Sequence, residues 1–189
     1  MKKVLSYILS SVFYLFYGSF LIIFHALQWL GFNIGKYKGH KAMVDLMNCT
    51  LTYLLYVLGT RIKFINNHSI PKNVPLIIVS NHQSMHDICP ISCYLKNYHP
   101  KFISKKELGK GIPSVSYNLR HGGSALINRK DPKQALPEIK KVAELVNNNN
   151  YSVVIFPEGT RSKTGEPKPF AVNGLKMLYK FAPDAYFLP

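Results

Sequence analysis

A histidine and an aspartate five residues apart follow a short apolar run. Residues 75–80 (PLIIVS) lead into the segment NHQSMHD, which holds His82 and Asp87. On one continuous helix these two side chains would point about 140° away from each other, so they can meet only across a turn. Pro90 is tolerated only in the first turn of a helix, which indicates that a helix begins near Asp87 and leaves His82 in the preceding loop. A carboxylate bonded to one imidazole nitrogen leaves the other free to take a proton, so the pair predicts a general base.

A second apolar run, residues 151–156 (YSVVIF), ends in the segment PEGTRS. Arg161 offers a two-pronged donor for phosphate, Gly159 allows the backbone to approach a ligand closely, and Thr160 adds a hydroxyl. The segment therefore predicts an anion site. Taken alone, it would instead be interpreted as a tight surface turn with an ion pair between Glu158 and Arg161.

Two further cations follow shorter predicted strands. Lys105 comes directly after residues 101–104, and Arg129 comes shortly after residues 124–127. In an open α/β sheet, ligands bind beyond the carboxyl ends of the strands. Three cations and a His–Asp pair at strand ends together predict a base that deprotonates a hydroxyl next to a phosphate.

Two other kinds of site have weaker support. His82 and His86 have the i, i+4 spacing of a helical metal pair, but zinc peptidases need Glu after the first His, where Gln83 stands. We therefore predict no metal site. The sequence has no GxSxG segment, so a hydrolase with a serine nucleophile has no candidate.

The elements that position these residues have the pattern of an α/β domain. The predicted strands are residues 61–65, 75–80, 101–104, 124–127 and 151–156. A continuous apolar run such as PLIIVS is typical of a strand buried on both faces of a parallel sheet. We expect a mostly parallel central sheet flanked by helices.

One helix is predicted between the last two strands. Its apolar positions fall at i, i+3, i+4 and i+7 and are Ile139, Val142, Ala143 and Val146. Asp131 and Pro132 fit its N-cap and first position, although Pro137 could reset the start. Residues 147–150, four asparagines, end it.

The N-terminal residues predict a membrane segment. Residues 4–35 contain no charged side chain, and this run exceeds the roughly 20 residues that cross a bilayer as a helix. It is too long for the apolar region of a signal peptide and no small-residue cleavage site follows, so we expect it to be retained. The alternative is a very apolar core helix. Residues 43–58 are also apolar and could lie in the core or at a membrane surface.

Lysines flank the apolar run on both sides, at positions 2 and 3 and at positions 36, 38 and 41. The positive-inside rule then gives no clear orientation. A break at Gly18 and Ser19 would form a helical hairpin in one leaflet with both flanks in the cytoplasm, and we favour this over a single span. We expect residues 1–60 to form the membrane-associated helices and residues 61–189 the α/β domain.

The composition limits the class of protein further. The 189 residues include 24 Lys and Arg and 9 Asp and Glu, for a net charge of +15, yet 47% are hydrophobic. The charge suggests nucleic-acid binding, but the long uncharged N-terminal segment argues against it. Residues 96–141 alone hold eleven Lys and Arg against three acidic residues. Such a segment suits an anionic partner.

The three cysteines, Cys49, Cys89 and Cys93, are too few and too unevenly spaced for a disulfide framework. We predict that they are small buried side chains in a reducing compartment.

Four segments resemble the motifs of the glycerolipid acyltransferases. NHQSMHD is similar to the family's NHxxxxD motif, GSALINR to GxxFIxR, FPEGTRS to the motif of the same letters, and YFLP to the start of the last motif. ISKKEL followed by GIP also resembles the family's connecting AKxEL…IP segment. The resemblance covers about residues 61–189. Leu126 stands where the family usually has Phe, and the chain ends inside the last motif, so we expect the C-terminal part of the fold to be missing.

The resemblance implies a glycerol-3-phosphate acyltransferase-like α/β fold and an acyl transfer. A fatty acyl group would pass from acyl-CoA or acyl-ACP to the free hydroxyl of a lysolipid, usually 1-acylglycerol 3-phosphate, and give phosphatidic acid for phospholipid biosynthesis. His82 is then the implied base and Asp87 its orienting partner. The implied substrate-binding residues are Lys105, Arg129, Glu158, Gly159, Thr160 and Arg161.

The resemblance also implies partners and a location. The hydroxyl attacks the thioester directly, so the expected reaction needs no cofactor beyond the acyl donor. The partners are the bilayer with its lysolipid and acyl-CoA or acyl carrier protein, without nucleic acid, at the cytoplasmic face of the inner or plasma membrane. The alternatives are another lysolipid acceptor such as a lyso-aminolipid, a nucleic-acid-binding module, and a membrane scaffold without catalysis.

Overall fold

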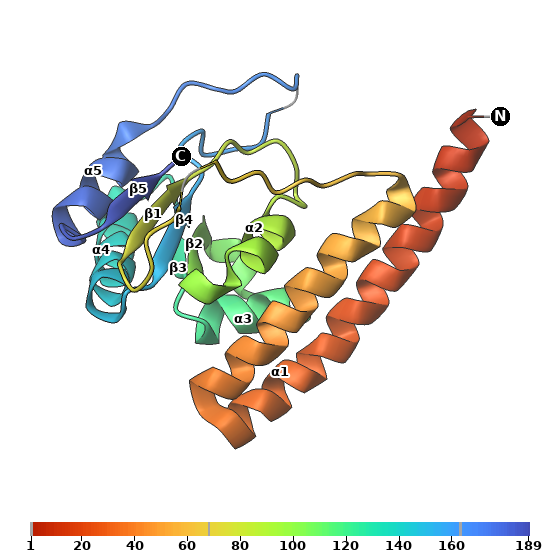
Figure 1. Cartoon of the computed structure of the whole chain (residues 1–189), viewed down its shortest axis with the longest axis horizontal. Helices are drawn as coiled ribbons and strands as arrows, with labels where there is room; N and C mark the ends of the chain where they lie inside the picture. Colours follow the sequence, from red (N-terminus) through yellow and green to blue (C-terminus); the bar gives the residue numbers. More distant parts are fainter. Residues whose placement is uncertain (1, 68, 163) are drawn as a thin grey trace.

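The computed structural model describes residues 2–67, 69–162 and 164–189, and of Lys2 only its backbone. The strands are β1 (Leu76–Val79), β2 (Pro100–Lys105), β3 (Ala125–Ile127), β4 (Ser152–Ile155) and β5 (Tyr186–Leu188). They form one sheet in the order β3-β2-β4-β1-β5, and every pairing is parallel. The predicted parallel sheet is therefore confirmed (Figure 1).

Helices and short 3-10 turns connect the strands. The helices are α1 (Lys2–Leu54), α2 (Ile88–Tyr94), α3 (Val115–His121), α4 (Pro132–Asn149) and α5 (Val172–Phe181). The 3-10 turns are η1 (Leu55–Leu58), η2 (Lys96–Tyr98) and η3 (Lys106–Gly109). Since β1, β2, β3 and β4 all run in the same direction, the segments that follow them begin at the same edge of the sheet.

One predicted strand is wrong. Residues 61–65 run as irregular chain between η1 and β1, and Phe64 and Ile65 remain 49% and 74% exposed. The alternation of polar and apolar residues there has no core to face. The neighbour of β1 on that side is β5, which was not predicted as a strand.

Each face of the sheet has its own apolar core. Ile77, Val153 and Ile155 face α4 and α5, whose buried side chains include Val146 and Leu178. The alternate residues of the same strands face α2, and this second core comprises Leu76, Ile78, Leu95, Phe102, Val154 and Phe156. Burial on both faces fixes the register of β1 and β4, because a shift by one residue would exchange the two cores.

The predicted helix over residues 131–149 is confirmed with its first cap. Asp131 accepts a hydrogen bond from the amide of Gln134, and Pro132 occupies the first position. Pro137 lies inside the helix and does not reset its start.

The N-terminal helix is a hairpin that reverses at Lys36, whose φ of 51° and ψ of −137° are not helical. The two arms, residues 2–35 and 37–54, meet at a glycine pair: a Cβ on Gly39 would lie 2.2 Å from the carbonyl oxygen of Gly31. A break at Gly18 and Ser19 was the wrong prediction. Gly18 has open space around it, and Ser19 donates a hydrogen bond to the carbonyl of Leu15, so the helix continues through both.

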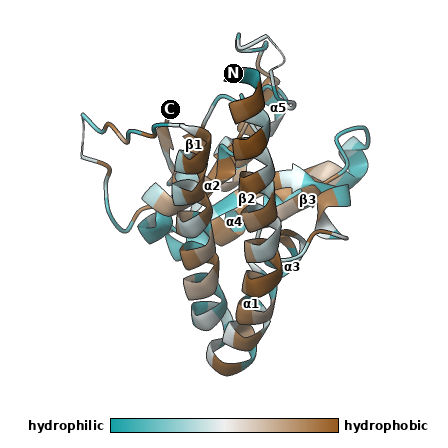
Figure 2. Ribbon diagram, turned by 90° about the vertical axis from the view of Figure 1, so that its right-hand side faces the viewer, coloured by the Kyte–Doolittle hydropathy of each residue, from teal (hydrophilic) through white to brown (hydrophobic). Residues whose placement is uncertain are grey.

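One side of the hairpin packs on the sheet domain and the other is uncovered. Leu21 and Phe24 of the first arm meet Met47 and Leu51 of the second arm, and Cys89 of α2 joins this core. Hydrophobic residues recur along the length of the first arm (Figure 2). Those whose side chains remain exposed include Val4, Leu5, Tyr7, Ile8, Leu15, Ile22, Ile23, Trp29 and Ile34. By length and composition, this helix could cross a membrane.

The closed end of the hairpin is fixed to the start of β2. Lys101, only 5% exposed, donates a 2.7 Å hydrogen bond from Nζ to the Tyr37 hydroxyl, which also contacts His99 Nδ1 at 3.0 Å. Burial lowers the pKa of Lys101 to about 8. The hairpin therefore contacts the sheet domain at two places, the start of β2 and α2.

The cysteine prediction was wrong for two of the three residues. Cys49 of α1 and Cys93 of α2 form a disulfide, with their Cα atoms 4.8 Å apart. The packing of the second arm on α2 brings together two residues 44 positions apart, a proximity that spacing in the sequence does not reveal. Cys89 is free and buried as predicted, and burial raises its thiol pKa to about 12.

Candidate active site

The loop after β1 brings His82 and Asp87 into contact. His82 Nδ1 lies 3.1 Å from Asp87 Oδ2, across a turn that ends where α2 begins. The same carboxylate oxygen accepts hydrogen bonds from the amides of Gln83 and Ser84, at 2.9 and 2.8 Å. These two amides fix the carboxylate, which in turn orients the imidazole.

The His82 ring has one nitrogen committed and one available. A carboxylate at Nδ1 favours the tautomer with its proton on Nδ1, which leaves Nε2 as an acceptor. The ring stacks on Phe156 with centroids 4.3 Å apart and planes 22° apart. The His82 side chain is 16% exposed, so most of the ring is covered by protein and a small part of it remains accessible to a ligand.

Glu158 faces the protein interior. It is 8% exposed, and its two carboxylate oxygens accept from the amides of His82 at 2.8 Å and Lys168 at 3.0 Å. These backbone hydrogen bonds hold the pKa of the Glu158 carboxyl below its usual range. Among the described residues Glu158 makes no ion pair with Arg161, so a surface turn closed by that pair is not what the structure contains.

The PEGTRS segment forms a turn that is hydrogen-bonded to the His82 loop. The amide of Gly159 donates to the carbonyl of Phe156, and the amide of Ser162 donates to the carbonyl of His82 at 2.8 Å. Gly159 has a φ of +70°, and a Cβ there would meet nothing within 4 Å. The left-handed backbone, rather than lack of space, therefore explains this glycine. Thr160 and Arg161 are exposed at the edge of the turn.

Lys105, Arg129 and Arg161 each follow the carboxyl end of a strand, as predicted. Lys105 ends β2, Arg129 lies two residues beyond β3, and the turn that holds Arg161 follows β4. All three side chains are exposed, and none forms an ion pair with an acidic residue in the described part of the chain. In the strand order, Arg129 belongs to the strand farthest from the one that His82 follows.

His86 connects the loop to the hairpin. Its ring makes edge contacts with Phe13 at 5.3 Å and Tyr17 at 5.6 Å between centroids. Burial lowers the pKa of His86. Across residues 2–67, 69–162 and 164–189, no group of three His, Cys, Asp or Glu residues is placed to hold a metal ion.

Two residues of the site were missed from the sequence. Phe156 is the platform for the His82 ring, and its position as the last apolar residue before PEGTRS is the signal that could have identified it. Lys168 bonds to the turn through its ammonium group, at 2.9 Å from both Thr160 Oγ1 and the Arg161 carbonyl oxygen. Nothing in the sequence pattern marks Lys168, because its contact depends on the path of residues 162–167.

Comparisons with known proteins identify relatives of the chain. The chain is 45% identical over 93 residues to a 1-acyl-sn-glycerol-3-phosphate acyltransferase of Helicobacter pylori, covering 48% of this chain and 37% of the relative. It is 28% identical over 127 residues to the alpha form of that enzyme from Ovis aries, covering 67% and 44%. The chain thus spans less than half the length of these two curated relatives.

A solved structure extends the comparison to the fold. The crystal structure of the 1-acyl-sn-glycerophosphate (LPA) acyltransferase PlsC from Thermotoga maritima matches with a TM-score of 0.76 and 26% identity. The match covers 96% of this chain, the hairpin included, and 72% of the other. The family model described as Acyltransferase matches residues 61–189. With more than half of its length and every strand of its sheet inside that match, the chain belongs to the acyltransferase family.

Proposed function

We propose that this protein transfers a fatty acyl group from acyl-CoA or acyl-ACP to the free hydroxyl of 1-acylglycerol 3-phosphate, which gives phosphatidic acid. The observation that carries the proposal is the His82–Asp87 contact at the same sheet edge as Lys105, Arg129 and Arg161, which form no ion pair in the described part of the chain. The relatives named as 1-acyl-sn-glycerol-3-phosphate acyltransferases support the choice of acceptor.

In the proposed reaction His82 is the general base. Its Nε2 takes the proton of the acceptor hydroxyl while the hydroxyl oxygen bonds to the carbonyl carbon of the thioester. The tetrahedral intermediate collapses as the carbon–sulfur bond breaks, and the thiolate leaves with the proton that His82 returns. Asp87 holds the ring and stabilises the imidazolium between these steps.

In the same proposal, Arg161, Lys105 and Arg129 bind the phosphate of the acceptor. Arg161 provides two parallel donors, and the lysine provides a compact charge. The hydroxyl of Thr160 accepts from Lys168 and still has its own proton to donate to a phosphate oxygen. Glu158 and Gly159 support this site indirectly: the Glu158 carboxylate holds the amides of His82 and Lys168, and Gly159 gives the turn its left-handed backbone.

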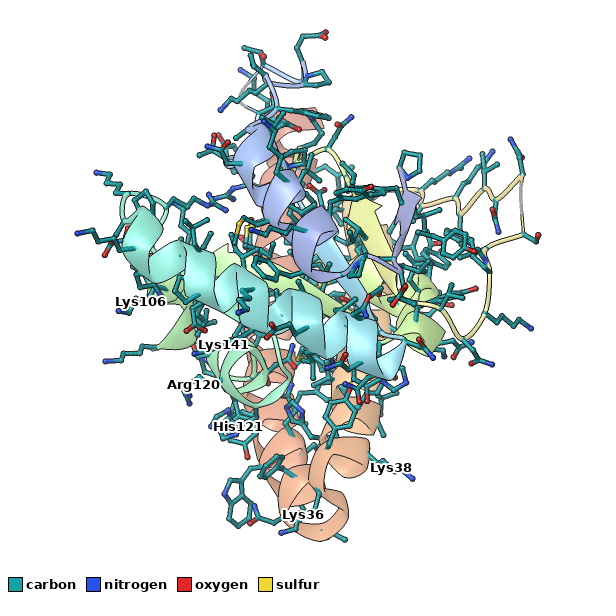
Figure 3. All side chains as sticks on the ribbon, turned by 90° about the vertical axis from the view of Figure 1, so that its left-hand side faces the viewer. Lys36, Lys38, Lys106, Arg120, His121 and Lys141 are labelled. Carbon is teal, nitrogen blue, oxygen red and sulfur yellow. A yellow bond between two sulfur atoms is a disulfide. The ribbon has the colours of Figure 1, made fainter. Side chains whose placement is uncertain are left out.

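We also propose that residues 1–60 hold the α/β domain, residues 61–189, on the cytoplasmic face of a membrane. The uncharged apolar side of the first arm supports insertion into lipid. Lys36 and Lys38 lie at the closed end of the hairpin, and Arg120 lies beside it on α3 (Figure 3). Cations at this position suit anionic headgroups. A lysolipid could then reach His82 without leaving the bilayer.

A panel of acceptors tests the proposal. The 189-residue chain in lipid vesicles would be given labelled acyl-CoA or acyl-ACP with 1-acylglycerol 3-phosphate, a monoacylglycerol or a lyso-aminolipid. We expect transfer to the phosphate-bearing acceptor to be the fastest. Equal rates on the phosphate-free acceptors would overturn the assigned acceptor, and the faster of the two thioesters would identify the donor.

A further inference from the structure

Lys168 connects to the PEGTRS turn at three points. Its amide donates to Glu158 Oε2 at 3.0 Å, and its ammonium group donates to Thr160 Oγ1 and to the Arg161 carbonyl oxygen, both at 2.9 Å. The side chain thus spans seven to eight residues of the chain and closes the loop that begins with the turn.

Short hydrogen bonds join the described residues between Arg161 and Lys168. Ser162 Oγ accepts from the amides of Thr164 and Gly165 at 3.2 and 3.0 Å, and Thr164 Oγ1 accepts from the amide of Glu166 at 3.4 Å. None of these three hydrogen bonds involves Thr160. In the part of the chain that the structure describes, the Lys168 ammonium supplies the side-chain bonds that join the end of the loop to Thr160 and Arg161.

We infer that Lys168 is a positioning residue. Its two side-chain hydrogen bonds, called the clasp below, fix the PEGTRS turn and hold Thr160 and Arg161 in place for phosphate binding. The inference rests on the proposed function for its kinetic consequence but not for the clasp itself. Two charge-assisted hydrogen bonds to adjacent residues restrict both the backbone of Arg161 and the hydroxyl of Thr160. A turn already in its bound shape loses less conformational entropy when the phosphate arrives.

The side chain and the backbone of Lys168 have separable effects. The bond to Glu158 comes from the amide, which a substitution at position 168 retains, and Glu158 in turn contacts the amide of His82. Loss of the ammonium group should therefore loosen the turn while the His82 loop stays braced. This predicts an effect on acceptor binding and little effect on the chemical step.

The variants are Lys168→Met, which keeps the alkyl stem, and Lys168→Arg, which keeps donors able to reach both oxygens. Lys176→Met, at an exposed position on α5, is the matched control. In the ligand-free full chain, the amides of Gly159, Ser162, Thr164 and Gly165 are hydrogen-bonded and report on the turn by hydrogen–deuterium exchange. We expect about 25- to 100-fold faster exchange in Lys168→Met, since two hydrogen bonds are lost and each contributes roughly a factor of five to ten.

The kinetic measurement compares the same variants on 1-acylglycerol 3-phosphate and on a monoacylglycerol. We expect Lys168→Met to raise KM for the phosphate-bearing acceptor about tenfold, to leave kcat within about threefold, and to leave the phosphate-free reaction unchanged. Lys168→Arg should recover most of the KM. A fall in kcat on both acceptors with unchanged KM would overturn the assignment to phosphate binding.

The exchange and kinetic measurements test different parts of the proposal. Unchanged exchange in Lys168→Met would overturn the clasp even if KM rises, because a direct phosphate ligand would leave the ligand-free turn unaltered. A wild-type chain without acyl transfer would overturn the proposed function, and the exchange experiment would still decide the clasp.

Discussion

The amide of His82 and the carboxylate of Glu158, 76 residues apart in the chain, are joined by a 2.8 Å hydrogen bond. The loop that holds the proposed base and the turn that holds the proposed phosphate site therefore form one unit. A second bond, from the amide of Ser162 to the carbonyl of His82, joins the same two loops. Because β1 and β4 are neighbours in the sheet, their following loops lie side by side, and Glu158 closes the contact.

Glu158→Gln should weaken this unit, because a carboxamide presents one acceptor and an N–H group to two backbone donors. We expect a lower Tm and a kcat reduced about tenfold or more, since one of the two buried acceptors is lost and a backbone N–H is left unpaired. The folded-state pKa of Glu158 is lowered, so its stabilising contribution is present above the unfolded pKa of about 4.3 and is lost as the pH falls through the folded pKa. The Tm difference between wild type and variant should be full at pH 7 and shrink below about pH 4.

Calorimetry at several pH values, with the exposed Glu166→Gln as control, checks this. A Tm difference that does not change with pH would show that the charge of Glu158 has no part in bracing the loop.

His82→Ala should remove acyl transfer and leave the protein folded and bound to vesicles. Loss of a general base costs about 10²–10⁴-fold in kcat. Asp87→Asn should cost less than His82→Ala, because it alters the orientation and tautomer of the ring without removing it. The measurements are kcat, Tm and vesicle flotation, and Lys176→Ala, at an exposed position on α5, is the control. Activity near the wild-type level in His82→Ala would contradict the assignment of the base.

Arg161→Ala should mainly raise KM for the phosphate-bearing acceptor. A charge-assisted pair of hydrogen bonds is worth about 1.5–3 kcal/mol, so we expect roughly a 10- to 100-fold increase in KM. Arg61→Ala, an exposed arginine in the connection before β1, is the matched control. If acceptor KM stays constant and kcat alone falls, Arg161 acts only in the transition state.

The features that the sequence predicted correctly depend on local signals. Four strands and α4 follow from apolar periodicity, Asp131 at the cap and the proline after it. The contact of His82 with Asp87 also has a local cause, because Pro90 places the start of α2 and leaves His82 in a turn. For such features, neighbouring residues in the sequence restrict the backbone enough to predict its conformation.

The features that the sequence missed depend on contacts between distant segments. The hairpin reverses at Lys36 because Gly31 and Gly39 allow two arms to touch, whereas an isolated Gly18 only lowers helix propensity without ending the helix. The disulfide of Cys49 and the bracing role of Glu158 likewise require knowing which elements pack together. The resemblance implied that Glu158 binds substrate, whereas in the folded chain its carboxylate accepts hydrogen bonds from two backbone amides.

Gly39→Ala should open the closed end of the hairpin. The new methyl group would lie 2.2 Å from the Gly31 carbonyl oxygen, which is rigid backbone and cannot yield as a side chain could. We expect destabilisation of at least about 1–3 kcal/mol, the usual cost of overpacking. Gly18→Ala, in open space on the first arm, is the matched control and should be neutral or stabilising by up to about 1 kcal/mol. Equal Tm values for the two variants would contradict the observed reversal.

The exposed apolar side of the first arm should account for membrane binding. Leu15 and Ile22 are 68% and 65% exposed and lie on this side, so the double variant Leu15→Glu and Ile22→Glu leaves the packed side intact. Each aliphatic side chain withdrawn from lipid forfeits about 1.5–3 kcal/mol, so vesicle binding should weaken about a hundredfold or more while Tm stays near that of wild type. The double variant Leu136→Glu and Val172→Glu, at 39% and 51% exposed positions on α4 and α5, adds the same charge away from the hairpin and should bind vesicles as wild type does. Weakening of equal size in both variants would mean that added negative charge, rather than the apolar side of the hairpin, governs the affinity for lipid.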